Sequence, residues 1–146
     1  MKIFLDTSSL FKLYHREVDT VIIEQIFSRV SVTSVYLSEI TKVEFTSSVW
    51  KKVRTREITE LEAIKTLQLF ERDSAKYTFI VTDSIVLEQA RNLTTKYGLR
   101  GLRTLDSIQL SSAISLRAEV GLFVTSDNLL KSLLSEEGLK TDMSTR

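Results

Sequence analysis

The sequence predicts a three-layer α/β/α sandwich around a central, mainly parallel sheet of about four to five strands. Short apolar, β-branched segments alternate along the chain with longer segments of helical periodicity. Proline is absent and glycine occurs only four times, so no Pro/Gly-rich linker divides the chain. A length of 146 residues is usual for one domain, and we expect a single domain spanning residues 1–146.

The first third of the chain begins with an apolar segment followed by the turn-prone sequence DTSS, which predicts a buried strand. A β-branched, alternating segment, VSVTSVY, predicts a second strand. The expected elements are a strand, two helices and a strand, at residues 2–5, 9–14, 19–29 and 30–36. Ser38 is a good N-cap for a helix over residues 39–54, with Glu39 in the first turn of that helix.

The next helix begins with a capping-box pattern formed by Thr59 and Glu62. Four apolar residues are expected on its inward face: Leu61, Ile64, Leu67 and Phe70. The later elements are a strand, two helices, a strand and a helix, at residues 77–82, 84–97, 103–119, 121–126 and 127–137. Two alternatives stay open for residues 139–146, which either add an edge strand or trail from the fold.

Composition excludes several classes of protein. Hydrophobic residues make up 42% and charged residues 27%, which is ordinary for a globular chain. No apolar run approaches the ~20 residues needed to span a bilayer, so no membrane association is expected. The apolar stretch at the N-terminus is too short for a signal peptide, and cysteine is absent, which favours a cytoplasmic location. Because the net charge is only +1, a nucleic acid would have to be held by a local basic patch.

Four acidic residues lie where a folded chain normally has apolar or small side chains. Asp6 follows the first strand and Asp127 follows the last, whereas Glu44 and Asp106 lie on or beside the apolar faces of their helices. Ligands bind beyond the carboxyl ends of parallel strands, so Asp6 and Asp127 would meet if their strands are neighbours. Clustered carboxylates repel one another, and a hard divalent cation is the usual remedy. The pattern therefore predicts one metal site.

Each acid also has a purely structural interpretation. Asp6 and Asp127 could cap helices, and Asp106 would gain about 0.3–1 kcal/mol from the dipole of its helix. Capping does not explain Glu44, and burial would penalise it. Taken together, the four acids favour the metal site, because active sites retain such costly groups.

The types of side chain near these acids indicate which metal and which chemistry to expect. Oxygen ligands without nearby His or Cys select Mg²⁺ or Mn²⁺ over zinc. Such ions orient water and neutralise charge that develops on a phosphodiester. Ser8 and Thr125 flank the acids at the strand ends, and we expect their hydroxyls to hold the carboxylates in place or to bind phosphate.

Basic residues form two groups in the sequence. The first, at the end of the helix over 39–54, is interpreted as a solvated helix terminus: Lys51, Lys52, Arg54 and Arg56. The second group contains Lys96, Arg100 and Arg103 and lies in a segment with two glycines. A mobile loop there could carry Arg100 and Arg103 to the phosphate backbone of RNA.

The chain contains four segments in a distinctive order: MKIFLDTSSLFKLY, SEITKVEF, LRTLDSIQLSSAI and FVTSDNLLKSLLSEEGL. In residue type and order they resemble the PIN-domain family, and in particular the VapC-type toxins of prokaryotic toxin–antitoxin pairs. The resemblance implies an Mg²⁺- or Mn²⁺-dependent endoribonuclease that is commonly a homodimer and is held inactive by a small antitoxin protein. It implies metal-ligand and catalytic roles for four residues, Asp6, Glu44, Asp106 and Asp127, and it places Ser8 and Thr125 at the family's hydroxyl positions.

Two residues depart from the family pattern, and two other functions compete with the nuclease. Ser107 stands where alanine is usual, and Gln109 replaces a more typical histidine or apolar residue. Neither change removes a ligand, so activity is still expected. One alternative is a non-catalytic PIN-like scaffold or nucleic-acid-binding module, although a scaffold would have no need for clustered charge. An aspartyl-phosphate phosphatase is more remote, because it would have a second acid two residues after Asp6, where Ser8 stands.

Overall fold

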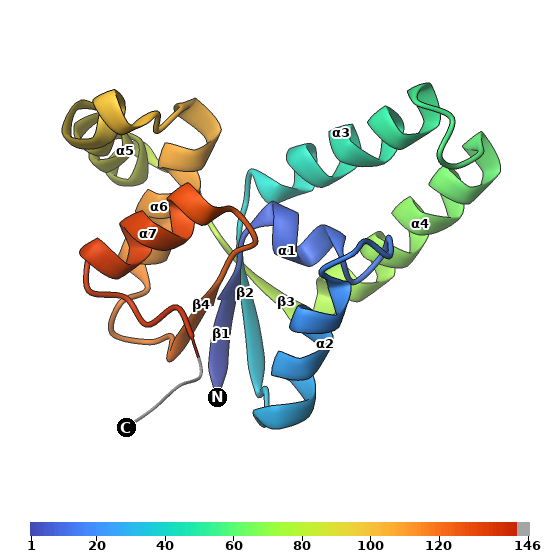
Figure 1. Cartoon of the computed structure of the whole chain (residues 1–146), viewed down its shortest axis with the longest axis horizontal. Coiled ribbons are helices and arrows are strands. Elements are labelled where there is room, and N and C mark those ends of the chain that lie inside the picture. Colours follow the sequence, from blue (N-terminus) through green and yellow to red (C-terminus); the bar gives the residue numbers. More distant parts are fainter. Residues whose placement is uncertain (143–146) are drawn as a thin grey trace.

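The computed structural model describes residues 1–142 and has a parallel sheet at its centre. Within these residues the sheet has four strands, in the order β3-β2-β1-β4. They are β1 (Lys2–Leu5), β2 (Ser34–Ser38), β3 (Tyr77–Ile80) and β4 (Leu122–Val124). Helices cover both faces of this sheet, so the predicted three-layer α/β/α sandwich is confirmed (Figure 1).

The helices divide between the two faces of the sheet according to their order in the chain (Figure 1). One face is covered by α1 (Thr7–Phe11), α2 (Thr20–Arg29), α3 (Thr41–Arg54) and α4 (Glu60–Asp73). The other face is covered by α5 (Ser84–Tyr97), α6 (Thr104–Ser115) and α7 (Asn128–Glu136). In the described part of the chain, no helix is both long enough and apolar enough to cross a membrane.

Alternation along the strands creates a hydrophobic core on each side of the sheet. Ile3 and Leu5 of β1 pack among the residues of α1 to α4, whereas Phe4 packs against α5, α6 and α7. All three side chains are at most 1% exposed. Successive strand residues point to opposite faces, so a strand covered on both sides must be apolar throughout. This is why the N-terminal segment reads as a continuous apolar run.

The start of α3 differs from the sequence prediction. The strand β2 extends to Ser38, which is fully buried and whose Oγ accepts a hydrogen bond from Ser112 Oγ at 3.2 Å. Ser38 is therefore not an N-cap, and α3 begins only at Thr41. Glu39 lies before the helix, where its carboxylate accepts a hydrogen bond from the backbone N–H of Thr82 at 3.2 Å. A buried strand end and a helix cap both favour serine, so residue type alone did not separate them.

The helix α4 confirms the predicted cap but only part of the predicted inward face. The hydroxyl of Thr59 accepts from the N–H of Glu62, and the Glu62 carboxylate accepts from the N–H of Thr59. Phe70 is buried in the core, whereas Leu61 and Ile64 are 61% and 45% exposed. Ala63, between them in the sequence, is fully buried and packs in the same core as Leu67 and Phe70, so the inward face of α4 runs through Ala63, Leu67 and Phe70. The far end of the α3–α4 hairpin projects away from the sheet (Figure 1).

The C-terminal segment lies beside β4. The carbonyl of Lys140 accepts a hydrogen bond from the backbone N–H of Phe123 at 2.8 Å, and Leu139 is buried in the core beside α5, α6 and α7. The first residues of the predicted edge strand or tail at 139–146 therefore pack on the fold. Residues 143–146 lie outside the described residues.

Phe45 links α3 to the core and is the residue whose loss should damage the fold most. Its ring is fully buried, and its centroid lies 4.3 Å from that of Phe70 and 5.2 Å from that of Tyr14. We predict that Phe45→Ala lowers the free energy of unfolding in urea by about 3–5 kcal/mol. Val43→Ala is the matched control, since Val43 is 74% exposed on the same helix, and it should cost less than about 0.5 kcal/mol. Equal losses in the two variants would contradict this packing.

Candidate functional site

The sheet topology creates a crevice at the carboxyl ends of β1 and β4. The chain passes from β1 to β2 and β3 on one side, while β4 pairs with β1 on the other side. Leu5 pairs with Val124, and the backbone N–H of Asp6 donates to the carbonyl of Val124 at 3.2 Å. The condition for Asp6 and Asp127 to meet, that the first and last strands are neighbours, is therefore met. In parallel α/β sheets, a reversal of strand order such as this one is where ligands bind.

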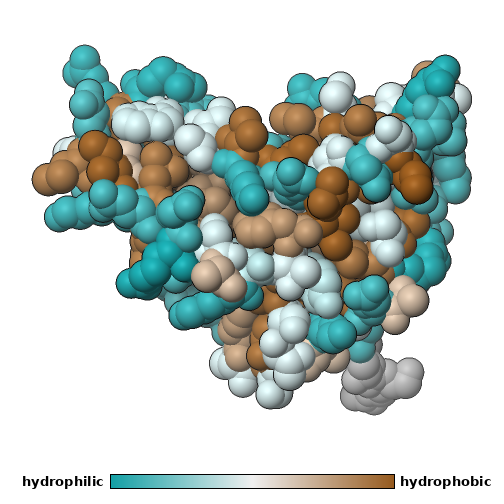
Figure 2. Space-filling view, turned by 180° about the vertical axis from the view of Figure 1, so that it is seen from behind, coloured by the Kyte–Doolittle hydropathy of each residue, from teal (hydrophilic) through white to brown (hydrophobic). Residues whose placement is uncertain are grey.

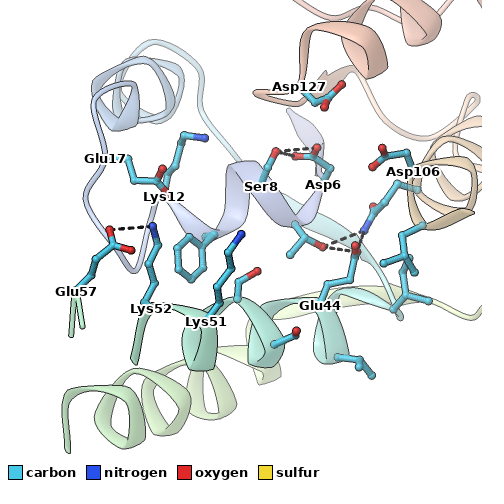
Figure 3. Close-up of a pocket in the computed structure, with 18 residues that line it drawn as sticks. Asp6, Ser8, Lys12, Glu17, Glu44, Lys51, Lys52, Glu57, Asp106 and Asp127 are labelled. Atoms are coloured by element: carbon cyan, nitrogen blue, oxygen red, sulfur yellow. Dashed lines mark hydrogen bonds and ion pairs between the residues drawn. The ribbon is translucent and has the colours of Figure 1, made fainter. Parts of the chain in front are cut away.

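An open pocket of about 760 Å³ lies at this edge of the sheet, and all four predicted acids line it (Figure 3). Asp6 follows β1, Glu44 lies on α3, Asp106 lies in the first turn of α6, and Asp127 is the N-cap of α7. Asp6 is buried, Glu44 and Asp106 are partly exposed, and Asp127 is exposed. Acids separated by up to 121 positions in the sequence thus face one cavity.

Asp6 is held in one orientation by hydroxyl and backbone donors. Ser8 Oγ donates to both carboxylate oxygens at 2.9 Å, and the N–H of Ser9 donates to Oδ1 at 3.0 Å. Thr125 Oγ1 donates to Oδ2 at 2.5 Å. Burial raises the pKa of Asp6 above its ordinary value, and the hydrogen bonds from Thr125, Ser9 and Ser8 oppose that rise. Asp6 is thus both the helix cap of its structural interpretation and the centre of a hydroxyl cluster.

Glu44 is held by residues that the sequence argument did not assign to the site. Its Oε1 accepts hydrogen bonds from Thr7 Oγ1 at 2.7 Å and from Gln109 Nε2 at 2.8 Å. The Gln109 amide also donates to Thr7 Oγ1 and to Thr41 Oγ1, and its own Oε1 is buried without a hydrogen-bond partner in the described part of the chain. The spacing in the sequence could have predicted a place for Gln109 in the site, since it lies three residues after Asp106 and therefore on the same face of α6.

Asp106 experiences the charge of the other three acids. Burial raises the pKa of Asp106, and the carboxylates of Asp127, Glu44 and Asp6 raise it further, while Arg103 opposes the shift. Within residues 1–142, none of these four acids forms an ion pair with a lysine or arginine. The pocket therefore concentrates negative charge that no protein cation neutralises directly.

The donor chemistry of the pocket fits a hard divalent cation. Carboxylates are the preferred ligands of Mg²⁺ and Mn²⁺, and no cysteine or histidine is among the described residues that line the pocket. The side chains do not converge on one point, however. Over residues 1–142, no group of three or more Asp, Glu, His or Cys side chains is arranged to hold a metal ion. Glu44 is instead bound to Gln109 and Thr7.

The two basic groups lie only in part where the sequence suggested, since Lys51, Lys52 and Arg54 do occupy the last turn of α3. Arg100 pairs with Glu136 and donates to Ser132 Oγ at 3.1 Å, both on α7, and it does not line the pocket. Arg103 immediately precedes α6, near enough to Asp106 to lower its pKa. In contrast, Lys51 and Lys52 line the pocket, although the sequence favoured a solvated helix end for them.

The sequence identifies the family to which this chain belongs. The sequence model of the PIN domain matches residues 3–133, which is most of the chain. The chain belongs to the PIN-domain family. The resemblance predicted from the four acidic segments is therefore confirmed at the level of the family. No curated protein matches the sequence significantly.

Solved structures similar to this PIN domain include toxins of toxin–antitoxin pairs. VapC20 from Mycobacterium tuberculosis, described as a sarcin-ricin loop cleaving toxin, has a TM-score of 0.68 and 15% identity, covering 90% of this chain and 94% of that one. VapBC2 from Rickettsia felis, bound to a DNA fragment from its promoter, has a TM-score of 0.65 and 17% identity, with coverages of 97% and 98%. A toxin–antitoxin complex from Klebsiella pneumoniae has a TM-score of 0.61 and 18% identity, covering 86% of each chain. At these identities the likeness establishes the fold.

Repulsion within the pocket of this PIN domain should be measurable as a stability difference. Folding raises the pKa of Asp106, so the charged carboxylate destabilises the folded protein at neutral pH. This cost disappears at low pH, where the carboxyl group is protonated in both the folded and the unfolded protein. We predict that Asp106→Asn stabilises the protein in EDTA near pH 7 by up to about 1 kcal/mol, after allowance for solvent screening. The gain should vanish at about pH 3, below the ordinary carboxyl pKa.

Urea denaturation at the two pH values measures this difference. Glu71→Gln on α4 is the control, because Glu71 is exposed and far from the pocket lining. That substitution should change stability by less than about 0.5 kcal/mol at either pH. A loss of stability in Asp106→Asn near pH 7 would contradict the electrostatic account.

Proposed function

We propose that this PIN domain is a metal-dependent endoribonuclease that hydrolyses RNA phosphodiester bonds, and that it acts as the toxin of a toxin–antitoxin pair. The main support is the shared pocket of four carboxylates at the edge where β1 and β4 end, with the pKa of Asp106 raised by burial and then by the other three. Membership of the PIN-domain family supports the same conclusion. So does similarity in fold to VapC20, which is described as cleaving the sarcin-ricin loop.

The proposed ligands of Mg²⁺ or Mn²⁺ are the four carboxylates of Asp6, Glu44, Asp106 and Asp127. A bound divalent ion supplies positive charge against the phosphodiester and orients the attacking water. The proposed ligands are the N-cap residues of α1 and α7, a residue of α3 and a residue in the first turn of α6. They come from both layers of helices, so the packed sheet between the layers sets their spacing. A site built on rigid elements keeps its geometry without further ordering when the substrate binds.

Neighbouring hydroxyl and amide groups would keep two of these ligands in place. Ser8 and Thr125 restrain Asp6 through hydrogen bonds of 2.5–2.9 Å, so that its carboxylate stays at the pocket edge. Gln109 and Thr7 both donate to Oε1 of Glu44, and neither bonds to Oε2. Partners of this kind fix the orientation of a ligand, and their loss typically weakens metal binding or activity about 10- to 100-fold.

Two other functions fit the pocket less well. A phosphatase that forms an aspartyl phosphate would need a second acid two residues after Asp6, but Ser8 stands there and donates to Asp6. A non-catalytic scaffold would have no use for four carboxylates without cationic partners, because removing that charge should stabilise it. The nuclease is therefore the function that the pocket supports best.

The proposed partners follow from the proposed function. An RNA substrate and a small antitoxin protein are expected, and the antitoxin is supported by the toxin–antitoxin complexes among the similar structures. We also propose that residues 1–146 act as one domain, that the toxin is a homodimer and that it works in the cytoplasm. Arg100 and Arg103 remain proposed RNA contacts, although Arg100 would first have to leave Glu136.

The direct test is cleavage of a mixed pool of structured and unstructured RNA by purified protein in Mg²⁺, Mn²⁺ or EDTA. We predict metal-dependent cuts that Asp6→Asn reduces more than about a hundredfold. Asp83→Asn is the matched control, because Asp83 also caps a helix, accepting from the N–H of Val86 at 2.9 Å, but does not line the pocket. Cleavage by Asp6→Asn at the wild-type rate, or cleavage unaffected by EDTA, would exclude the proposed mechanism.

A further inference from the structure

The pocket has a second end, opposite the four carboxylates, where three lysines lie with Glu17 and Glu57 (Figure 3). Lys12, which follows α1, lines it together with Lys51 and Lys52 of α3. Glu44 and Lys51 are seven residues apart on α3, almost two full turns, so they lie on the same face of the helix. At 1.5 Å per residue, their backbones are about 10 Å apart along the axis. One helix thus connects the end of the pocket with the four carboxylates to the end with the three lysines.

Lys51 differs from the other two lysines because it has no acidic partner. Lys12 pairs with Asp19 at 3.4 Å, and Lys52 pairs with Glu57 at 3.2 Å. Within the described residues, Lys51 takes part in no ion pair. Its side chain extends from α3 between the Lys52–Glu57 pair and Glu44 (Figure 3). Its charge is therefore available to an anionic ligand in the pocket.

The wall of the pocket beside the carboxylates Glu44 and Asp106 is partly apolar. Val43 of α3 and Leu105 of α6 line the pocket and are 74% and 50% exposed. Figure 2 shows that hydrophobic (brown) and hydrophilic (teal) side chains are also mixed over the face of the molecule seen from behind. Apolar side chains contribute nothing to the binding of a small inorganic ion, but they can contact the faces of unstacked bases and riboses.

We propose that Lys51 binds a second phosphate of a single-stranded RNA whose scissile phosphate lies at the carboxylates. This inference rests on the proposed nuclease function and specifies how the substrate is held. Because the backbones of Glu44 and Lys51 lie about 10 Å apart along α3, a continuous strand with more than one phosphate can reach both ends of the pocket. Because the four carboxylates repel that strand, a cation beyond them is needed to hold it in register. Single-stranded RNA is required because its bases must be free to contact Val43 and Leu105.

The test measures binding of fluorescent single-stranded RNAs of increasing length, starting from a nucleoside monophosphate, in Mg²⁺. The parent protein carries Asp106→Asn to prevent cleavage, and it is compared with the same protein carrying Lys51→Gln or Arg54→Gln. Arg54 is the matched control, since it is exposed one turn further along α3 and does not line the pocket.

We predict that Lys51→Gln weakens binding of the oligonucleotides roughly threefold to fivefold, which is the size of an exposed ion pair. It should also reduce the slope of log affinity against log salt by about 0.7, as expected for one lost contact to a single strand. Binding of the monophosphate should stay unchanged. Arg54→Gln should match the parent at every length, and Lys51→Arg should retain the salt slope.

Several results would overturn the proposal. These are equal binding by the Lys51→Gln and Arg54→Gln proteins, an equal loss for the monophosphate, or no dependence of binding on length in the parent. Lys51-dependent binding of a polyglutamate peptide as tight as that of RNA would also overturn it, because the lysine would then recognise acidic protein chains. Failure of the nuclease proposal can be distinguished from failure of the proposed role of Lys51. In that case the protein with Asp106 intact would not cleave RNA, while length-dependent binding through Lys51 would persist.

Discussion

The parallel pairing of β1 with β4 is the constraint on which the rest of the site depends. It brings the end of the first strand to the end of the last, so that the Asp6 backbone bonds to Val124 and the Asp6 carboxylate bonds to Thr125. A buried carboxylate is tolerated only where donors compensate for lost water, and this pairing provides one of those donors. The same pairing places the loop with Asp127 beside Asp6. Moving β4 by one residue would therefore disturb both the core and the pocket.

The helix α3 carries both core residues and pocket residues. Phe45 fixes the helix to the core, and the preceding residue, Glu44, faces the pocket. Two turns later Lys51 faces the same pocket, so one packed helix sets the distance between the carboxylate and the lysine. The far end of the α3–α4 hairpin extends beyond the sheet (Figure 1). A substitution in the packing of α3 should therefore affect substrate alignment as well as folding.

Much of this architecture could be predicted from the sequence because its signals are local. Apolar strands covered on both faces, helix caps such as Thr59, and acids placed directly after strands each have one simple physical explanation. The two acids at strand ends, Asp6 and Asp127, were placed correctly at one edge because parallel strands share their direction. Ser8 was expected to hold a carboxylate or to bind phosphate because it flanks Asp6, and its hydroxyl bonds to both oxygens of Asp6.

Other features depend on packing between distant segments and were missed for that reason. Ser38 has the residue type of a helix cap, but its burial beside Ser112 makes it the end of a strand. Gln109 departs from the family pattern, and only the folded chain shows that its amide reaches Glu44. Lys51 belongs to a cluster of basic residues that is typical of a solvated helix end. It lies in the pocket because it is seven residues, almost two turns, after Glu44 on the same helix. The helical spacing between Glu44 and Lys51 was the feature of the sequence that could have predicted this.

The central claim is that the four carboxylates act together as one site for a divalent cation. The most direct measurement is urea unfolding of the wild type and of single variants of the four acids, with and without Mn²⁺. A ligand that binds only the folded state should stabilise the wild type by about 2.7 kcal/mol at a hundredfold excess over its Kd. The account predicts this gain in the wild type and a large reduction in Asp6→Asn, Glu44→Gln, Asp106→Asn and Asp127→Asn. Equal stabilisation of the wild type and all four variants, or none in the wild type, would contradict it.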